Sequence, residues 1–188
     1  MWRRRADFDQ DQENIIKDVD KARARTLNRA VKLLAAKPRS VGELRGRLLE
    51  KNWTNDEIVE SVIKKLKEYN YLDDKQFARS LALSKLRQKP QGKRRLRQTL
   101  SQKHLDKEVV DEAIVSAFEK MPEEDLINLA IEKRLRLKGK PETREDTKKF
   151  YDHLLRQGFG FDLIRGRMSE IAKGEFEQDG GGGFSTIG

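Results

Sequence analysis

Seven basic side chains gather in one short stretch of the sequence, where they could bind phosphate groups. No Asp or Glu occurs between Asp74 and Asp106, a stretch of 31 residues that holds ten Lys or Arg residues. Its densest part contains Lys85, Arg87, Lys89, Lys93, Arg94, Arg95 and Arg97. The summed field of such a stretch attracts phosphates or an acidic protein surface. A solvated helix face is the alternative for any basic stretch, but the absence of acids favours a binding surface.

Residue types suited to catalysis or metal binding are scarce in this chain. There is no Cys, which excludes disulfides, a thiolate zinc site and a Cys nucleophile, and His104 and His153 are the only histidines. Asp73 and Asp74 are adjacent, and adjacent residues on a helix do not face each other, so we interpret them as helix-capping residues. The Gly run at 180–183 is not followed by the Lys or the helix of a phosphate-binding loop. We therefore expect no catalytic residues, no cofactor and no metal, and a protein that is not an enzyme.

The chain as a whole is basic and rich in charge. Its 188 residues include 41 Lys or Arg and 32 Asp or Glu, a net charge of +9, and residues 75–122 alone carry +7. Charged residues make up 39% of the chain and hydrophobic residues 36%, which favours small modules over one large core. No apolar stretch approaches the ~18 residues that cross a bilayer, and the basic start at residues 1–5 lacks the apolar segment of a secretory signal. We expect a cytoplasmic protein with an anionic partner and no membrane association.

The elements that position these side chains repeat along the chain at intervals of 52 and 54 residues. The intervals relate Leu44, Leu96 and Phe150; Leu48, Leu100 and Leu154; Trp53, Leu105 and Phe159; and Ile58, Val110 and Ile164. They also relate Asn52, His104 and Gly158, three residue types that readily adopt the left-handed conformation at the end of a helix. We therefore predict three structural repeats, with these three residues at matching turn positions. Trp53 and its two counterparts are expected to pack each turn onto the core rather than to stack on a ligand.

Each repeat is predicted to contain three helices and no strand. Helix starts are predicted at Ser40 and Thr54, each followed by Glu three residues later, and at Asp106, Pro122 and Thr143. The fold class is an all-α tandem array of three three-helix, helix-turn-helix-like repeats, elongated and curved. The expected divisions are a charged N-terminal segment at 1–25, repeats at 26–74, 75–122 and 123–173, and a flexible Gly-rich tail at 174–188.

Four segments of the chain form recognisable motifs: residues 39–44 (RSVGEL), 71–78 (YLDDKQFA), 92–96 (GKRRL) with Leu100, and 154–159 (LLRQGF). They resemble the RecX family of bacterial RecA regulators, and the resemblance covers residues 26–173. Asn52 and His104 stand where the family often has Gly. The resemblance implies tandem three-helix modules that bind the RecA–single-stranded DNA filament and lower its recombinase and co-protease activities, with roles in DNA repair and the SOS response. A monomer with salt-dependent affinity for single-stranded, and also double-stranded, DNA is expected.

Two other functions remain open from the residues themselves. A DNA-binding protein without RecA specificity fits the helix-turn-helix-like units, but the third helices start with acids, at residues 55–57 (NDE) and 106–108 (DKE). Acids at those positions would repel phosphates, so sequence-specific DNA recognition is disfavoured while sequence-independent binding is retained. A helical scaffold for an acidic protein is the third possibility.

Overall fold

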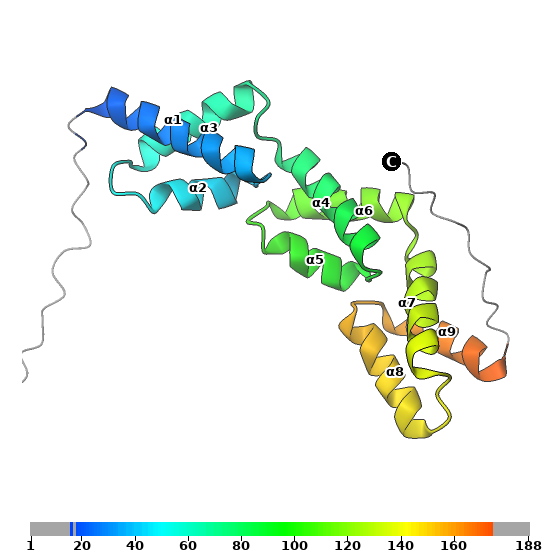
Figure 1. The fold of residues 1–188 in the computed structure, drawn as a ribbon. Helices are drawn as coiled ribbons and strands as arrows, with labels where there is room; N and C mark the ends of the chain where they lie inside the picture. The colour runs from blue at the N-terminus through cyan, green and yellow to red at the C-terminus, as the bar shows by residue number, and fades with distance from the viewer. Residues whose placement is uncertain (1–15, 17, 175–188) are drawn as a thin grey trace, which may run out of the picture. The chain divides into compact units, whose positions relative to one another are not determined.

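The computed structural model describes residue 16 and residues 18–174 (Figure 1). Within this part the chain forms nine α-helices and no strand, which confirms the all-helical prediction. The chain divides into two compact units at the boundary between Asp74 and Lys75. Most of the expected N-terminal segment and nearly all of the expected Gly-rich tail lie outside the described residues.

The first unit is one three-helix repeat. It comprises α1 (Val19–Ala36), α2 (Val41–Leu49) and α3 (Asp56–Glu68), with α1 packed on both of the others (Figure 1). Its core contains Ala30, Leu44, Leu48, Val59, Val62, Ile63, Leu66 and Leu72. The helix α1 begins earlier than the expected start of the repeat at residue 26, because the Asp18 side chain accepts a hydrogen bond from the Lys21 N–H and caps the helix.

The predicted helix cap is found at the start of α2 but not at the start of α3, where Thr54 and the adjacent Asn55 have different roles. The Ser40 hydroxyl caps α2 as predicted, accepting a hydrogen bond from the Glu43 N–H at 3.0 Å. The prediction that Thr54 caps α3 is wrong: Asn55 is the cap, and its side-chain oxygen accepts from the Ile58 N–H at 3.0 Å. Thr54 is instead buried, and its hydroxyl accepts a hydrogen bond from Thr26 of α1 at 3.1 Å. This buried pair joins the turn to α1.

The expected left-handed turn positions behave differently from one another. His104 and Gly158 have φ values of 51° and 89°. Asn52 does not have a positive φ, so its expected conformation is corrected: α2 ends in a right-handed cap at Glu50, and the Lys51 N–H donates to the Leu48 carbonyl. Asn70 takes the left-handed conformation at the end of α3, with a φ of 58°.

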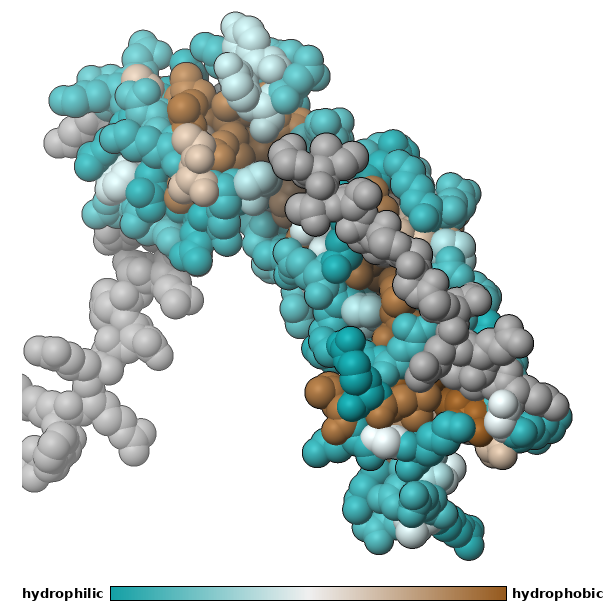
Figure 2. All heavy atoms as spheres, turned by 45° about the vertical axis from the view of Figure 1, so that its right-hand side comes forward, coloured by the Kyte–Doolittle hydropathy of each residue, from teal (hydrophilic) through white to brown (hydrophobic). Residues whose placement is uncertain are grey.

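The second unit contains the other two predicted repeats. One is α4 (Asp74–Gln88), α5 (Lys93–Ser101) and α6 (Lys107–Lys120), and the other is α7 (Glu123–Lys138), α8 (Arg144–Arg156) and α9 (Phe161–Lys173). A single apolar core runs through all six helices, so these two repeats are one packed body. The repeat positions predicted as core are buried here, among them Leu96, Leu100, Leu154 and Ile164. On the face drawn in Figure 2, hydrophilic side chains cover most of the described surface of both units.

Candidate nucleic-acid interface

The seven predicted basic residues lie on α4, on α5 and between them, and two of them, Lys93 and Arg95, contact the last repeat at the junction between the two repeats of the second unit. Lys85 and Arg87 are in the last turn of α4, Lys89 follows that helix, and the other four are on α5. Lys85 is half-buried and the remaining six are exposed. The placement agrees with a surface role, but the contacts separate the seven residues into two groups.

Three of the seven side chains bind other parts of the second unit. The Lys93 Nζ lies 3.2 Å from a Glu123 carboxylate oxygen, and an Arg97 guanidinium nitrogen lies 2.8 Å from Asp111. Arg95 donates to the backbone carbonyl of Arg156 at 3.0 Å. These contacts link α5 to α6, to the start of α7 and to the end of α8. The three residues therefore have a structural role within the second unit, apart from any binding to a partner.

Backbone contacts hold the same junction together. The Gly92 N–H donates to the Gln157 carbonyl at 2.9 Å, and the Arg94 N–H donates to the Gly158 carbonyl at 3.3 Å. A Cβ atom on Gly92 would overlap the backbone of Gly158, and one on Gly158 would overlap the backbone of Arg95. The two glycines therefore allow the start of α5 and the end of α8 to meet backbone to backbone.

The other four residues make no ion pair within the described part of the chain. They are Lys85, Arg87, Lys89 and Arg94. Arg87 lines a shallow depression together with Ser80, Ser84 and Gln88 of α4. These four side chains keep their positive charge available to phosphates, so we expect them to contribute more to binding than the three that bind other parts of the unit.

The pKa of His153 indicates a positive electrostatic field near Lys89, one of these four residues. Its pKa is lowered from its ordinary value, first by burial and then by the positive charges of Arg134, Arg156 and Lys89. Lys89 comes from one repeat and the two arginines from the next, so the junction brings cations from distant parts of the sequence to one place. Arg134 and Arg156 were not among the predicted residues, because nothing in their local sequence indicates that they lie near Lys89.

A second basic row, on α1, was also missed. Lys21, Arg25, Arg29 and Lys32 follow one another at helical spacing and make no ion pair within the described residues. A sequence signal for it exists: no acid occurs between Asp20 and Glu43, while seven Lys or Arg residues do. The stretch is shorter than the acid-free stretch of the second repeat, so its sequence signal is weaker.

Metal and membrane features are not found in the described chain. No group of three or more His, Asp or Glu side chains in that part is placed to hold a metal ion. None of its helices is long and apolar enough to span a bilayer.

Two family models match the chain. The model of the first three-helix domain of RecX matches residues 27–66, and the model of the second three-helix domain of RecX matches residues 73–114. The two matched segments correspond to the first two predicted repeats.

Relatives named regulatory protein RecX match most of the chain. The protein from Prosthecochloris aestuarii is 36% identical over 78% of this chain and 93% of its own length. The protein from Chlorobaculum tepidum is 33% identical over 74% of this chain and 83% of its own length. The protein from Bacillus subtilis is 31% identical over 81% of this chain and 56% of its own length.

Two crystal structures share the fold. RecX from Lactobacillus salivarius matches with a TM-score of 0.72 and 20% identity, over 82% of this chain and 99% of that chain. A second structure, of regulatory protein RecX, matches with a TM-score of 0.67 and 23% identity, over 78% of this chain and 71% of that chain.

Proposed function

The chain belongs to the RecX family, and we propose that it binds the RecA–single-stranded DNA filament and negatively regulates the recombinase and co-protease activities of RecA. The observation that carries this proposal is the match to regulatory protein RecX over 93% of the length of that relative. A match of that extent includes the repeats that would contact a filament, rather than one shared module.

The charge of the second unit supports an anionic partner of this kind. Four basic side chains of the predicted seven make no ion pair in the described chain, and Lys89, Arg134 and Arg156 act together on His153. A filament of protein on DNA presents phosphates, and each Lys or Arg that neutralises a phosphate releases a counterion and adds affinity. Several repeats that touch successive protomers would add further affinity through multivalency.

The proposal includes where and how the protein works. A regulator of RecA acts in the cytoplasm, where chromosomal DNA is, and acts by binding rather than by catalysis. We propose that it does so as a monomer, without a cofactor, through the basic surface of the second unit. Inhibition then follows from occupying or spreading the protomers of the filament.

Co-sedimentation with RecA filaments tests the proposal. The protein is mixed at micromolar concentration with RecA filaments on single-stranded DNA, and both its pelleting and the DNA-dependent ATPase activity are measured. Pelleting together with a dose-dependent loss of ATPase is expected. A protein that neither pellets nor inhibits would contradict the proposed function.

The alternative is a sequence-independent DNA-binding protein without RecA specificity, which the unpaired basic residues also favour. The two functions differ in what DNA does to the interaction. An excess of bare single-stranded DNA should leave filament binding largely intact if RecA is recognised, and should abolish it if DNA alone is recognised. Equal affinity for bare DNA and for filaments would favour the alternative.

A further inference from the structure

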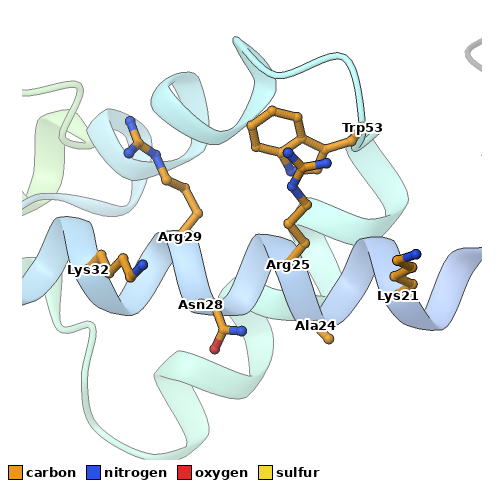
Figure 3. A pocket seen from close by; sticks show the side chains of 7 residues that line it. All are labelled: Lys21, Ala24, Arg25, Asn28, Arg29, Lys32 and Trp53. Atoms are coloured by element: carbon orange, nitrogen blue, oxygen red, sulfur yellow. The ribbon is translucent and has the colours of Figure 1, made fainter.

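The first unit has a basic pocket on α1 that the predicted binding surface does not include (Figure 3). Lys21, Arg25, Arg29 and Lys32 line it together with the indole of Trp53, and its volume is about 530 Å³. No Asp or Glu of the described chain lines this pocket, although Asp18 lines a smaller hollow beside it. A pocket of that size has room for a nucleotide.

Trp53 does not play the role expected from its position in the repeat. Its counterpart Phe159 is fully buried in the core of the second unit, and its counterpart Leu105 packs against that core. Trp53 is half-buried and is not part of the core of the first unit. Its ring instead faces Arg25, whose guanidinium carbon lies 3.7 Å from the ring centroid. The expectation that Trp53 packs the turn onto the core is therefore wrong.

Stacking against Trp53 orients the planar Arg25 guanidinium so that it can bind a ligand. The Arg25 guanidinium lies over the Trp53 ring (Figure 3), which restricts its orientation, and the Arg25 side chain makes no ion pair in the described chain. A held guanidinium loses less side-chain freedom on binding, and its N–H groups match the oxygens of a phosphate in a fork. The outer face of such a pair is also a surface on which a nucleobase can stack.

The neighbouring cations continue this site along the helix. Arg29 projects to the same side of α1 as Arg25 (Figure 3), and its buried Nε has no hydrogen-bond partner within the described chain. Lys21, Arg25 and Arg29 are four residues apart, which places their Cα atoms about 6 Å apart along the helix axis. That spacing is comparable to the spacing of successive phosphates on a nucleic-acid strand. Lys32 extends the row by one more turn.

We propose that the α1 pocket binds a single nucleic-acid strand, with phosphates on Lys21, Arg25, Arg29 and Lys32 and a base stacked on the Trp53–Arg25 pair. A basic row with an aromatic stacking surface is the combination that single-strand-binding proteins use. An acidic peptide would satisfy the cations but stacks on the ring only where it carries an aromatic residue, whereas every base of a nucleic-acid strand has a face that can stack, so the nucleic acid is favoured. The inference deepens the proposed function, since it gives the first unit its own contact with the DNA strand.

Charge removal in the full-length protein tests the phosphate row. The double variant Arg25→Gln/Arg29→Gln is compared with Lys64→Gln/Lys67→Gln, which removes the same charge from exposed positions on α3 outside the pocket. Affinity for free oligo(dT), measured without RecA, should fall at least tenfold in the first variant and less than threefold in the second. The slope of log affinity against log salt should decrease by about 1.4 in the first variant, since each contact to a single strand contributes about 0.7. Equal losses in the two variants would overturn the proposal.

Tryptophan fluorescence tests the stacking. The chain has two tryptophans, so Trp2→Phe leaves Trp53 as the only indole. Oligo(dT) should quench its emission, while an abasic oligonucleotide of the same length and a poly-glutamate peptide should not. Quenching by all three ligands would reduce the site to a general anion site, and stronger binding of poly-glutamate would identify an acidic protein as the ligand. Either result overturns the inference. The proposed function is tested independently, by co-sedimentation with RecA filaments.

Discussion

Glycine is required at position 158 for two reasons, its backbone conformation and the lack of space for a Cβ atom, and substitution should reveal both. Its φ is 89°, and a Cβ atom there would overlap the Arg95 backbone. Gly139 has a φ of 75° and a ψ of 179°, a combination that only glycine adopts readily, but open space around it, so its substitution carries a conformational cost without a steric clash. We expect Gly139→Ala to lower the free energy of unfolding by about 1–3 kcal/mol, and Gly158→Ala to lower it by more because the clash is added. Urea denaturation measures both, and equal losses would mean that the repeat junction adds nothing.

His153 should make the second unit sensitive to mild acid. Its pKa is lowered in the folded protein by burial and by Arg134, Arg156 and Lys89, so the unfolded chain binds a proton at a higher pH than the folded chain does. Stability should therefore fall as the pH drops below the ordinary His pKa of about 6.5 towards the lowered folded value. The variant His153→Gln should lose less stability than the parent between pH 7.5 and 5.5. Parallel pH profiles of the two urea midpoints would contradict this expectation.

The helix α5 uses its basic residues for two purposes, and charge reversal should separate them. Lys93 and Arg97 form ion pairs with Glu123 and Asp111, whereas Arg94 on α5 and Arg87 on α4 make no ion pair in the described chain. Arg87→Glu/Arg94→Glu should reduce filament binding more than tenfold and change stability by less than about 0.5 kcal/mol. Lys93→Glu/Arg97→Glu should cost roughly 1 kcal/mol or more, because exposed pairs contribute about 0.2–1 kcal/mol each and reversal adds repulsion. Co-sedimentation measures filament binding and thermal melting measures stability. Equal losses of binding in the two double variants would contradict a functional difference between the ion-paired and the unpaired residues.

The two units have separate cores, so the whole molecule should unfold in two steps. Leu48 belongs to the core of the first unit and Leu100 to the core of the second. Leu48→Ala should lower only the stability of residues 18–74, and Leu100→Ala only that of residues 75–174, by about 2–5 kcal/mol each. Hydrogen exchange followed by mass spectrometry assigns each loss to a unit. A loss of protection in both units from either variant would indicate one cooperative molecule.

The elongated shape expected from the repeated sequence is also a property of the whole molecule. A compact protein of this length has a radius of gyration of about 16 Å. Three repeats in a row should give a clearly larger value in solution. Small-angle X-ray scattering measures it, and the compact value would contradict the tandem array.

The sequence predicts the core better than it predicts the surface. Leu44, Leu96 and Phe150 are buried as expected, because an apolar period fixes which face of a helix packs. The cap of α3 was misplaced because Thr54 and Asn55 are adjacent and either residue type can cap a helix. The pairing of Lys93 with Glu123 joins residues that are distant in sequence, and local pattern cannot indicate it.

At the candidate site, the role of Trp53 likewise could not be predicted from the sequence. Its place in the repeat predicts a core residue, and two of the three repeats follow that pattern. Its contact with Arg25 depends on how α1 packs over the turn, which is a tertiary property. The acid-free stretch from Lys21 to Gly42 could have indicated the α1 row, but not the ring against which Arg25 rests.

The backbone contact between Gly92 and Gly158 has a consequence for synthesis on the ribosome. The residues of the first unit can pack together once that unit has left the exit tunnel. The helix α5 cannot complete its backbone hydrogen bonds until Gln157 and Gly158 have been translated, more than sixty residues after Gly92. At about 5–20 residues per second that delay lasts roughly 3–13 seconds, during which the core side of α4, α5 and α6 is incompletely covered. We therefore expect the nascent middle repeat to expose apolar surface during this delay, and a translational pause between residues 120 and 158 should lengthen its association with a chaperone.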